Sequence, residues 1–512
     1  MKKIKLLILI ILILTTTSCT SKEKVIDPID DNYRVFYEIF VGSFSDSNND
    51  GIGDLQGIIN RLDYLNDGDI NSNNSLGIQG IWLTPIFKAN SYHKYDVVDY
   101  YSIDKEFGDQ ETLDQLIEKA HQRNVSIILD LVINHTSSEH LWFKQFVKAH
   151  QENDTSNKYY DYYVYAPKDN TPKNRAFCEI LNTDEMYECN FSYLMPELNF
   201  DNEKVRKEVL DIAKYYIDKG IDGFRFDAAK YIYFSSNNNS IDFWNWYCDE
   251  LRKMKEDIYL VGEVWSFDNE TKQYDKAMNC FNFTMAQAEG MIASAARGSN
   301  INNFTNYVVS FQNSSKNQML IPFISNHDMD RASGYLNIMN GRAFIGANLY
   351  LLLPGSPFIY YGEEIGMKGT RGNANSDANR RLAMLWGDED TIKDPIEANF
   401  PNSKQINGTV KEQSNNENSL LNHYQKLIHI RNKYPFIARG NYEQLNLNNE
   451  HVGGFKVTYN DEITYIIHNT SDSSITINDL KYNQIIEVIG LNDASYQNGQ
   501  LTIGAQTSIL IK

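Results

Sequence analysis

Three carboxylic acids lie at the carboxyl ends of short apolar runs in this sequence, where acid, base or nucleophile chemistry is often placed. Asp227 follows the run 223–226, Glu263 follows 259–261, and Asp328 follows 319–324. The first two are about one strand–helix unit apart and the third lies about two units further on, so in a barrel all three would converge on one mouth. Arg225 lies two residues before Asp227 and therefore on the same strand face. A buried arginine there would keep the carboxylate ionised and oriented, as a nucleophile requires.

The elements that would position these acids alternate regularly along the chain. Apolar β-type runs alternate with amphipathic stretches of helical period such as 112–123 and 204–219. This alternation predicts parallel βαβ units and, repeated over some 400 residues, an α/β fold of the (β/α)8 TIM barrel type. The clearest runs are 35–40, 78–83, 125–132, 223–226, 259–261, 319–324 and 356–361.

Two segments interrupt or end this rhythm. The polar, Tyr- and Asn-rich segment 137–199 is too long for a βα loop, which predicts a small domain inserted after the third strand. Beyond about residue 440, short alternating strands predict a C-terminal antiparallel β-sandwich. We therefore expect a barrel over 32–136 and 200–438, an inserted domain over 137–199, and a C-terminal domain over 439–512. The sandwich strands are expected at 454–459, 463–468, 475–477, 484–488, 501–503 and 508–511.

The N-terminus resembles that of an exported bacterial lipoprotein. Three lysines precede the apolar run 6–14, which is too short to span a bilayer but suits a signal peptide. Cys19 follows a small residue, as in a lipobox, so we expect a signal peptide over 1–18, lipidation of Cys19, and a polar tether over 19–31. The expected location is outside the cell, lipid-anchored to the cell membrane or surface. The alternative is a plain signal peptide in which Cys19 is discarded.

Composition narrows the classes of partner. The formal net charge is −19, which disfavours nucleic acid and anionic lipid surfaces and suits a neutral substrate. The 33 tyrosines, 25 phenylalanines and 6 tryptophans suit stacking on sugar rings, although aromatic enrichment has other causes. Cys178 and Cys189 flank a hairpin-like segment and form the candidate disulfide, and no cysteine spacing resembles a zinc site. We expect a monomer.

Six motifs together resemble one family. The segments 130–135, 223–231, 262–265 and 323–328 resemble short conserved regions of the α-amylase superfamily, glycoside hydrolase family 13, and 80–86 and 195–199 resemble two further regions. The resemblance covers about residues 33–440. The segment Met195-Pro-Glu-Leu-Asn199 resembles lipoprotein α-amylases intermediate between the oligo-1,6-glucosidase and neopullulanase subgroups.

The resemblance implies an enzyme and a mechanism. It implies retaining endo-hydrolysis of α-1,4-glucosidic bonds in starch, glycogen or maltooligosaccharides, with Asp227 as nucleophile, Glu263 as general acid/base and Asp328 stabilising the distorted sugar. Alternatives are an exo-acting α-glucosidase or oligo-1,6-glucosidase, a cyclomaltodextrinase or neopullulanase, and a transglycosylase. A non-catalytic sugar-binding surface protein is a remote alternative. The implied substrate-binding residues are Tyr95, His93, His135, Arg225, Lys230, Trp265 and His327.

Two calcium sites are expected. The loop 46–54 places oxygen donors at alternate positions, with a backbone carbonyl at Ile52 and a glycine at the tight turn, as hard Ca²⁺ requires. Its expected ligands are Asp46, Asn48, Asp50, Ile52 and Asp54. The resemblance implies a second site between barrel and inserted domain, formed by Asn134, Glu197 and the carbonyl of Tyr231.

Overall fold

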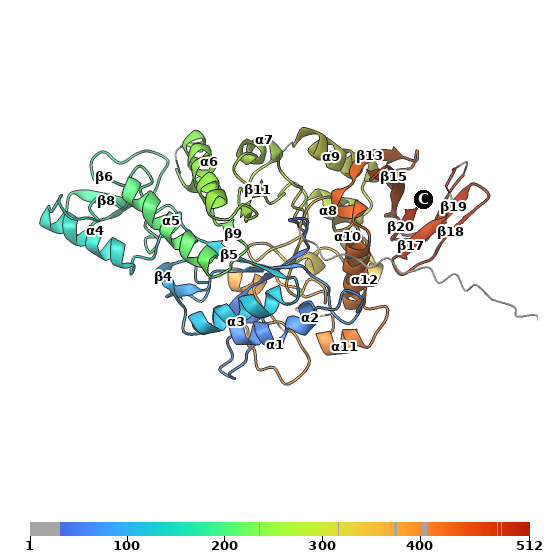
Figure 1. Cartoon of the computed structure of the whole chain (residues 1–512), viewed down its shortest axis with the longest axis horizontal. Coiled ribbons are helices and arrows are strands. Elements are labelled where there is room, and N and C mark those ends of the chain that lie inside the picture. Colours follow the sequence, from blue (N-terminus) through green and yellow to red (C-terminus); the bar gives the residue numbers. More distant parts are fainter. Residues whose placement is uncertain are drawn as a thin grey trace, which may run out of the picture.

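The computed structural model describes residues 31–512 except 235, 316, 373–375, 402–406, 479 and 483. The expected signal peptide, Cys19 and the tether up to residue 30 lie outside these residues. Figure 1 shows a central body with the segment carrying α4, β6 and β8 projecting at one end and the C-terminal strands at the other. Within the described residues, no helix has the length and apolar character needed to cross a membrane.

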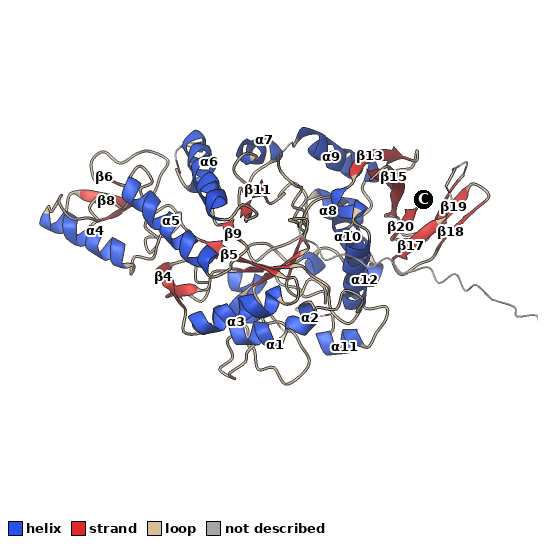
Figure 2. Cartoon of the chain, viewed as in Figure 1, coloured by secondary structure: helices blue, strands red, loops and turns tan. Residues whose placement is uncertain are grey.

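In the described part of the chain, seven parallel strands form the barrel wall, in the order β11-β10-β9-β5-β2-β1-β12, and helices surround them (Figure 2). Gly223 at the start of β9 is required by close packing, because a Cβ there would lie 2.0 Å from the Tyr259 carbonyl oxygen of β10. The strands are β1 (Phe36–Ile39), β2 (Gly80–Leu83), β5 (Ser126–Leu131), β9 (Gly223–Phe226), β10 (Tyr259–Gly262), β11 (Asn279–Cys280) and β12 (Phe358–Tyr360).

In the sequence, the longer barrel helices lie between these strands. Two of them, α3 and α5, match the predicted helical stretches to within two residues. The helices of the barrel region are α1 (Leu55–Asn60), α2 (Leu62–Leu65), α3 (Gln110–His121), α5 (Glu203–Asp218), α6 (Asn237–Met254), α7 (Asp268–Thr271), α8 (Met291–Ala296), α9 (Ile301–Ser314), α10 (Arg342–Leu351), α11 (Val410–Ser414), α12 (Leu420–Lys433) and α13 (Phe436–Arg439). The antiparallel hairpin of β3 (Phe87–Ala89) and β4 (Val97–Ile103) lies between β2 and α3.

The segment 319–324 does not form the regular strand that was predicted, although it closes the barrel. It runs between β11 and β12: the carbonyls of Leu320 and Pro322 accept hydrogen bonds from the N–H groups of Ser356 and Phe358 at 2.9 and 3.0 Å. On the other side, the Ile321 carbonyl accepts from the Asn282 N–H at 3.0 Å. Pro322 has no N–H to donate, which prevents a continuous ladder. The closed (β/α)8 architecture is therefore confirmed with an irregular member.

The projecting segment contains α4 (Leu141–Glu152) and a three-stranded antiparallel sheet in the order β6-β8-β7. Its strands are β6 (Tyr165–Pro167), β7 (Phe177–Glu179) and β8 (Glu185–Glu188). Cys178 and Cys189 form a disulfide across β7 and the end of β8, which confirms the predicted pair. This bridge closes the hairpin on itself.

The C-terminal strands form two antiparallel sheets, in the orders β13-β14-β15-β20-β17 and β16-β19-β18. Ile467 and Ile509 of one sheet share an apolar core with Leu501 and Ile503 of the other, as expected of a β-sandwich. Prediction missed β13 and β18. The strands are β13 (Asn441–Asn446), β14 (Val452–Tyr459), β15 (Glu462–Asn469), β16 (Ile475–Ile477), β17 (Ile485–Ile489), β18 (Ala494–Gln497), β19 (Gln500–Ile503) and β20 (Thr507–Ile511).

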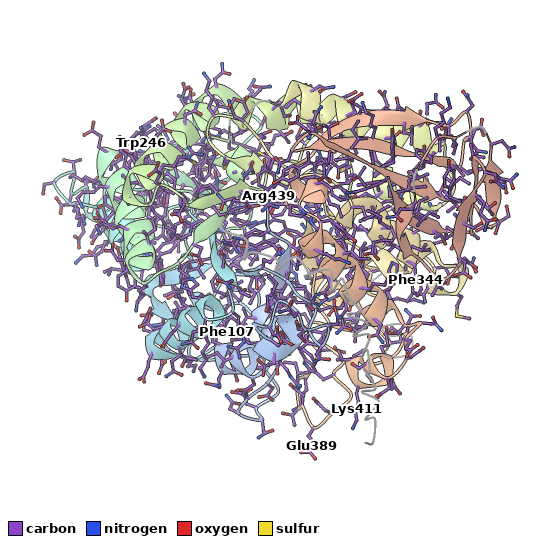
Figure 3. The ribbon with its side chains drawn as sticks, turned by 45° about the vertical axis from the view of Figure 1, so that its right-hand side comes forward. Phe107, Trp246, Phe344, Glu389, Lys411 and Arg439 are labelled. Atoms are coloured by element: carbon purple, nitrogen blue, oxygen red, sulfur yellow. A yellow bond between two sulfur atoms is a disulfide. The ribbon has the colours of Figure 1, made fainter. Side chains whose placement is uncertain are left out.

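The first described residue is held at the amino-terminal end of β1. Both carboxylate oxygens of Asp31 accept hydrogen bonds from Arg439, at 2.7 Å each; Arg439 is labelled in Figure 3. The chain therefore enters the barrel at the end opposite the carboxyl ends of the strands.

Candidate active site

Arg225, in β9, is the centre of the charge cluster at the carboxyl ends of the barrel strands. Its guanidinium is fully buried and donates to Asp130 Oδ1 at 2.9 Å and to Asp227 Oδ1 at 2.6 Å. The other terminal nitrogen donates to Glu263 Oε2. Because Asp227 and Glu263 contact the same guanidinium from neighbouring strand ends, their carboxyl groups lie side by side.

Glu263 is positioned by the backbone at the end of β9 and just beyond it. Its N–H donates to the Phe226 carbonyl at 2.9 Å, and its Oε2 accepts from the Ala228 N–H at 3.3 Å. Burial raises the pKa of Glu263 to about 8, assisted by the charge of Asp227 and opposed by Arg225. A carboxyl with this pKa holds its proton at neutral pH, so it can act as a general acid.

Asp328 is surrounded by positive charge and stays ionised. Arg381 donates to its Oδ1 at 2.7 Å, and His327 Nε2 lies 2.9 Å from its Oδ2. Although burial works in the opposite direction, His327 and Arg381 hold the pKa of Asp328 well below its usual range. This carboxylate is suited to stabilise positive charge on a bound group.

His327 is itself held as an imidazolium. Its Nδ1 lies 2.6 Å from Glu38 Oε1, on the inner side of β1. Burial lowers the pKa of His327, but the carboxylates of Asp328 and Glu38 outweigh it and raise the pKa to about 10. Both ring nitrogens are therefore donors at neutral pH.

Tyr95 joins these groups into one network. Its hydroxyl donates to Asp130 Oδ2 at 3.0 Å and lies 2.7 Å from His327 Nε2, and its ring is nearly parallel to that of His327. His135 Nε2 lies 3.2 Å from the Tyr95 carbonyl oxygen, and burial lowers the pKa of His135 so that the ring is neutral. Five of the residues implied for substrate chemistry thus meet Asp227 and Glu263 in one cluster: Arg225, Tyr95, His327, His135 and Asp328.

The other three implied substrate-binding residues lie outside this cluster of ion pairs. His93 Nδ1 contacts the Ser91 hydroxyl and the Tyr95 N–H, and burial, with Arg381, lowers its pKa to about 4. Lys230 pairs with Glu270 at 2.9 Å. Trp265 is 42% exposed and packs on a neighbouring ring. Lys230 and Trp265 belong to the loops that continue from Asp227 and Glu263.

Sequence reasoning did not assign Glu38, Asp130 or Arg381 to the site. A signal existed for the two acids, because each is an isolated charge in an apolar strand run, where an unpaired carboxylate would be costly. Arg381 comes from an irregular stretch after β12 and had no such signal. These residues fix the ionisation and orientation of the groups that sequence reasoning did identify.

The predicted calcium loop is stabilised by turns that its own side chains form. Asp46 Oδ1 accepts from the N–H groups of Asn48 and Asn49 at 3.0 and 2.8 Å, and Asp46 Oδ2 accepts from Gly51 at 2.7 Å. Asp50 Oδ1 accepts from the Ile52 N–H at 2.8 Å. Gly51 has φ +95°, which favours glycine at the tight turn.

Asp54 has a structural partner in the same loop. Its Oδ1 accepts from the Gly57 N–H at 2.6 Å and thereby caps α1. Each carboxylate oxygen can accept more than one bond, so the loop still has the hard oxygen donors that Ca²⁺ prefers. Among the residues that the structure describes, no three His, Cys, Asp or Glu side chains gather as a metal site of their own.

The residues of the second predicted calcium site are only partly brought together. The Asn134 amide donates to the Tyr231 carbonyl at 2.5 Å. Glu197 Oε1 accepts from the N–H and the side-chain amide of Asn190 at 3.0 and 2.7 Å. These contacts bring Asn134 and Tyr231 together but direct Glu197 into the inserted domain, and the second site stays a prediction.

Comparison with known proteins agrees with this architecture. The α-amylase catalytic domain family matches residues 38–440. α-Amylase 3 of Dictyoglomus thermophilum is 34% identical, with 93% of each chain covered. The crystal structure of α-amylase from H. orenii superimposes with a TM-score of 0.82 at 36% identity, covering 94% of this chain and 99% of that one. An oligo-1,6-glucosidase of Bacillus cereus is 30% identical, covering 85% of this chain and 90% of the relative.

A parallel barrel with paired carboxyls at the carboxyl ends of neighbouring strands defines a class of glycosidase. The chain belongs to the α-amylase family of glycoside hydrolases.

Proposed function

We propose that this protein is an α-amylase that cleaves internal α-1,4 bonds of starch, glycogen or maltooligosaccharides with retention of configuration. The observation that carries the proposal is that the carboxyl groups of Asp227 and Glu263, from neighbouring strand ends, both contact Arg225. Retaining glycosidases need two carboxyls about 5 Å apart, one nucleophilic and one acidic. The α-amylases among the relatives support the substrate class.

The reaction proceeds in two balanced steps. In the first, Asp227 attacks the anomeric carbon while Glu263 gives its proton to the leaving glycosidic oxygen, so the sugar becomes bound to Asp227 as an ester. In the second, the Glu263 carboxylate takes a proton from water, which attacks the same carbon and releases Asp227. Asp227 leaves the second step as a carboxylate and Glu263 regains its proton, so the glucan and water are the only reactants.

The surrounding groups stabilise the oxocarbenium-like sugar between these steps. Ionised Asp328 lowers the energy of developing positive charge. His327 and His135 contact the hydroxyl and the carbonyl of Tyr95, and the Tyr95 ring offers a face for stacking on the sugar. An exo-acting oligo-1,6-glucosidase is the second candidate, because the Bacillus cereus relative carries that activity.

Product analysis separates these candidates. Wild-type protein and Asp227→Asn are assayed on soluble starch, maltoheptaose, pullulan and isomaltose, with products resolved by chromatography. The proposal expects mixed maltooligosaccharides from starch and maltoheptaose, little action on isomaltose, and loss of all activity in Asp227→Asn. Release of glucose alone, or preferential cleavage of isomaltose, would favour the second candidate. Equal inactivity of both proteins, with maltooligosaccharides still bound, would favour a sugar-binding protein.

We propose further that the loop 46–54 holds a structural Ca²⁺ through Asp46, Asn48, Asp50, the Ile52 carbonyl and Asp54. The ion would fix the loop after β1 and take no part in bond cleavage. Chelation is expected to lower the Tm of the wild-type protein, and added Ca²⁺ should restore it. In Asp50→Ala, chelation should lower the Tm by a smaller amount. Asp169→Ala, an exposed acid of the inserted segment, is the control. Absence of Tb³⁺ luminescence sensitised by the protein, with no Tm shift, would contradict the site.

We also propose that the protein is exported and anchored to the membrane by lipid on Cys19. The signal-peptide pattern and the small residue before Cys19 support this proposal. Labelling of producing cells with a radioactive fatty acid should mark wild type and not Cys19→Ala. A Cys19→Ala protein that is still labelled, or a mature N-terminus elsewhere, would contradict it.

A further inference from the structure

A buried polar network joins the C-terminal sandwich to the barrel, between helices α10 and α12 on one side and strands β15, β17 and β20 on the other (Figure 1). Buried polar groups need partners, so the direction of each hydrogen bond in such a network can be worked out. The side chains of the network are His423 (α12), Asn348 (α10), Ser508 (β20) and His468 (β15), and all of them are buried.

The Asn348 amide sets the direction of these hydrogen bonds. Its Nδ2 donates to the Ile489 carbonyl at 2.9 Å and to Ser508 Oγ at 3.0 Å. A carbonyl can only accept, so the amide cannot be turned around, and Asn348 Oδ1 accepts from His423 Nε2 at 2.8 Å. Ser508 already accepts from Asn348 and directs its own hydrogen to His468 Nδ1, at 2.7 Å. His468 Nδ1 is therefore an acceptor.

Both imidazoles are neutral in this network. Because Nδ1 accepts, His468 carries its hydrogen on Nε2, which is buried and has no partner among the described residues. Burial lowers the pKa of His468 to about 3 and that of His423 to about 4. At His423, the charge of Lys426 lowers the pKa further, and the hydrogen bond to the Phe344 carbonyl opposes both effects.

The charged groups of this interface lie at its rim. Arg342, at the start of α10, pairs with Asp472 at 2.7 Å, and Lys433 of α12 pairs with Glu487 of β17 at 3.2 Å. On β14, the ring of Phe455 faces the network. Within the described residues, neither imidazole forms an ion pair with a carboxylate, so a proton added to either ring would be a buried charge without a counter-charge.

We propose that His468 and His423 form a pH-sensitive switch that keeps the C-terminal sandwich on the barrel while both rings are neutral and releases it in acid. A proton on His468 Nδ1 would displace the hydrogen that Ser508 donates, and the network would lose its continuity.

The sign of the pH dependence follows from the two depressed pKa values. When the interface opens, each ring returns to its ordinary pKa of about 6.5. The contact therefore keeps its full stability above about pH 6.5 and loses it as the pH falls toward the folded values of about 4 and 3. Because opening takes up two protons, the opening equilibrium should rise about 100-fold per pH unit between about pH 6 and 4, tenfold for each histidine.

Hydrogen exchange of the full chain measures this opening. Exchange is read peptide by peptide by mass spectrometry and corrected for the intrinsic pH dependence of amide exchange. In wild type, peptides that contain β15 and β20 should lose protection steeply below about pH 6, while peptides that contain β9 keep theirs.

A double variant tests the two histidines. His468→Asn places an amide acceptor where Nδ1 lies, and His423→Gln places an amide donor where Nε2 lies, so the hydrogen bonds remain and the titration is removed. Protection of β15 and β20 at pH 7 should match wild type and then change by less than about threefold per pH unit. The matched control is Asp472→Asn, which breaks the rim pair with Arg342 and should keep the wild-type pH dependence.

The outcomes that would overturn the switch are specific. One is a wild-type protein in which β15 and β20 keep their protection down to pH 4, or lose it together with β9. The other is a double variant with the same steep loss as wild type. If the double variant does not fold at pH 7, the single variant His468→Asn decides: a slope of about tenfold per pH unit supports the switch, and the wild-type slope overturns it.

Discussion

Two buried clusters in this molecule each combine one arginine with two or more acids, yet they differ in what they can do. Arg225 contacts Asp130, Asp227 and Glu263 in the barrel. In the inserted domain, Arg175 pairs with Glu188, and the Asn190 amide links Glu188 to Glu197 at 2.6 and 2.7 Å.

The electrostatics of the two clusters are alike. Burial raises the pKa of Glu197 to about 8, with help from Glu188, and the pKa of Glu263 is raised to about the same value. A raised pKa in a buried acid therefore does not distinguish a catalytic site in this protein.

The difference lies in where the acids come from. Asp130, Asp227 and Glu263 end three neighbouring parallel strands, β5, β9 and β10, so their side chains meet at one barrel mouth. Glu188 and Glu197 belong to one short stretch of chain beside the disulfide. Topology, more than local charge, turns buried acids into a reaction centre.

Loss of each arginine should separate catalysis from stability. Arg225→Met is expected to lower kcat/KM on maltoheptaose by at least about 10³-fold, because Asp227 and Glu263 lose the group that orients them. Arg175→Met should lower the free energy of unfolding by about 3–5 kcal/mol, since Glu188 is left buried without its partner, while kcat per folded molecule stays near wild type. Steady-state kinetics and denaturant unfolding measure the two effects. Equal loss of kcat in both variants would contradict the claim that only the Arg225 cluster acts in catalysis.

The pH profile of kcat/KM should identify Glu263 as the general acid. Above its pKa of about 8, Glu263 loses the proton that the leaving oxygen needs, so kcat/KM on maltoheptaose should fall about tenfold per pH unit. α-Maltosyl fluoride needs no such proton, so its kcat/KM should lack this alkaline decline. The same decline on both substrates would assign it to another group or to unfolding.

Removal of the disulfide should have the smallest effect on catalysis. The Cys178→Ser, Cys189→Ser double variant is expected to lose about 2–3 kcal/mol of stability, because the loop that the bridge closes is short. Its kcat should stay within about twofold of wild type, since neither cysteine contacts the Arg225 cluster. Thermal unfolding and initial rates provide the comparison. A large loss of kcat at a temperature where the variant is folded would show that the inserted domain acts directly on the centre.

The sequence predicted those parts of the fold and site that local pattern determines. β9 was predicted to the residue, and the acids after β9 and β10 stood out because a charge ends an apolar run. Strand β11 was missed because a strand of two residues is too short to show an alternation of side chains. The segment 319–324 was predicted as a regular strand because it is mostly apolar, but it contains Pro322, which interrupts the hydrogen-bond ladder.

Contacts between residues far apart in the sequence could not be predicted from local patterns. Arg381, which directly follows a short 3-10 helix (Asp377–Arg380), reaches Asp328, and no pattern in the neighbouring residues predicts this partner. The pair of Lys230 with Glu270 likewise depends on how two loops meet at the barrel mouth. Such contacts form only when the closed barrel brings distant segments together, so local sequence patterns do not predict them.

Covalent trapping tests the central claim most directly. 5-Fluoro-α-D-glucosyl fluoride forms the glycosyl-enzyme but slows its hydrolysis, because the ring fluorine destabilises the oxocarbenium-like transition state. Peptide mass spectrometry of the treated protein should find one fluoroglucosyl group, on the peptide that contains Asp227 and absent from Asp227→Asn. A group attached to another residue, or turnover that releases the β-anomer first without any trapped species, would contradict the account.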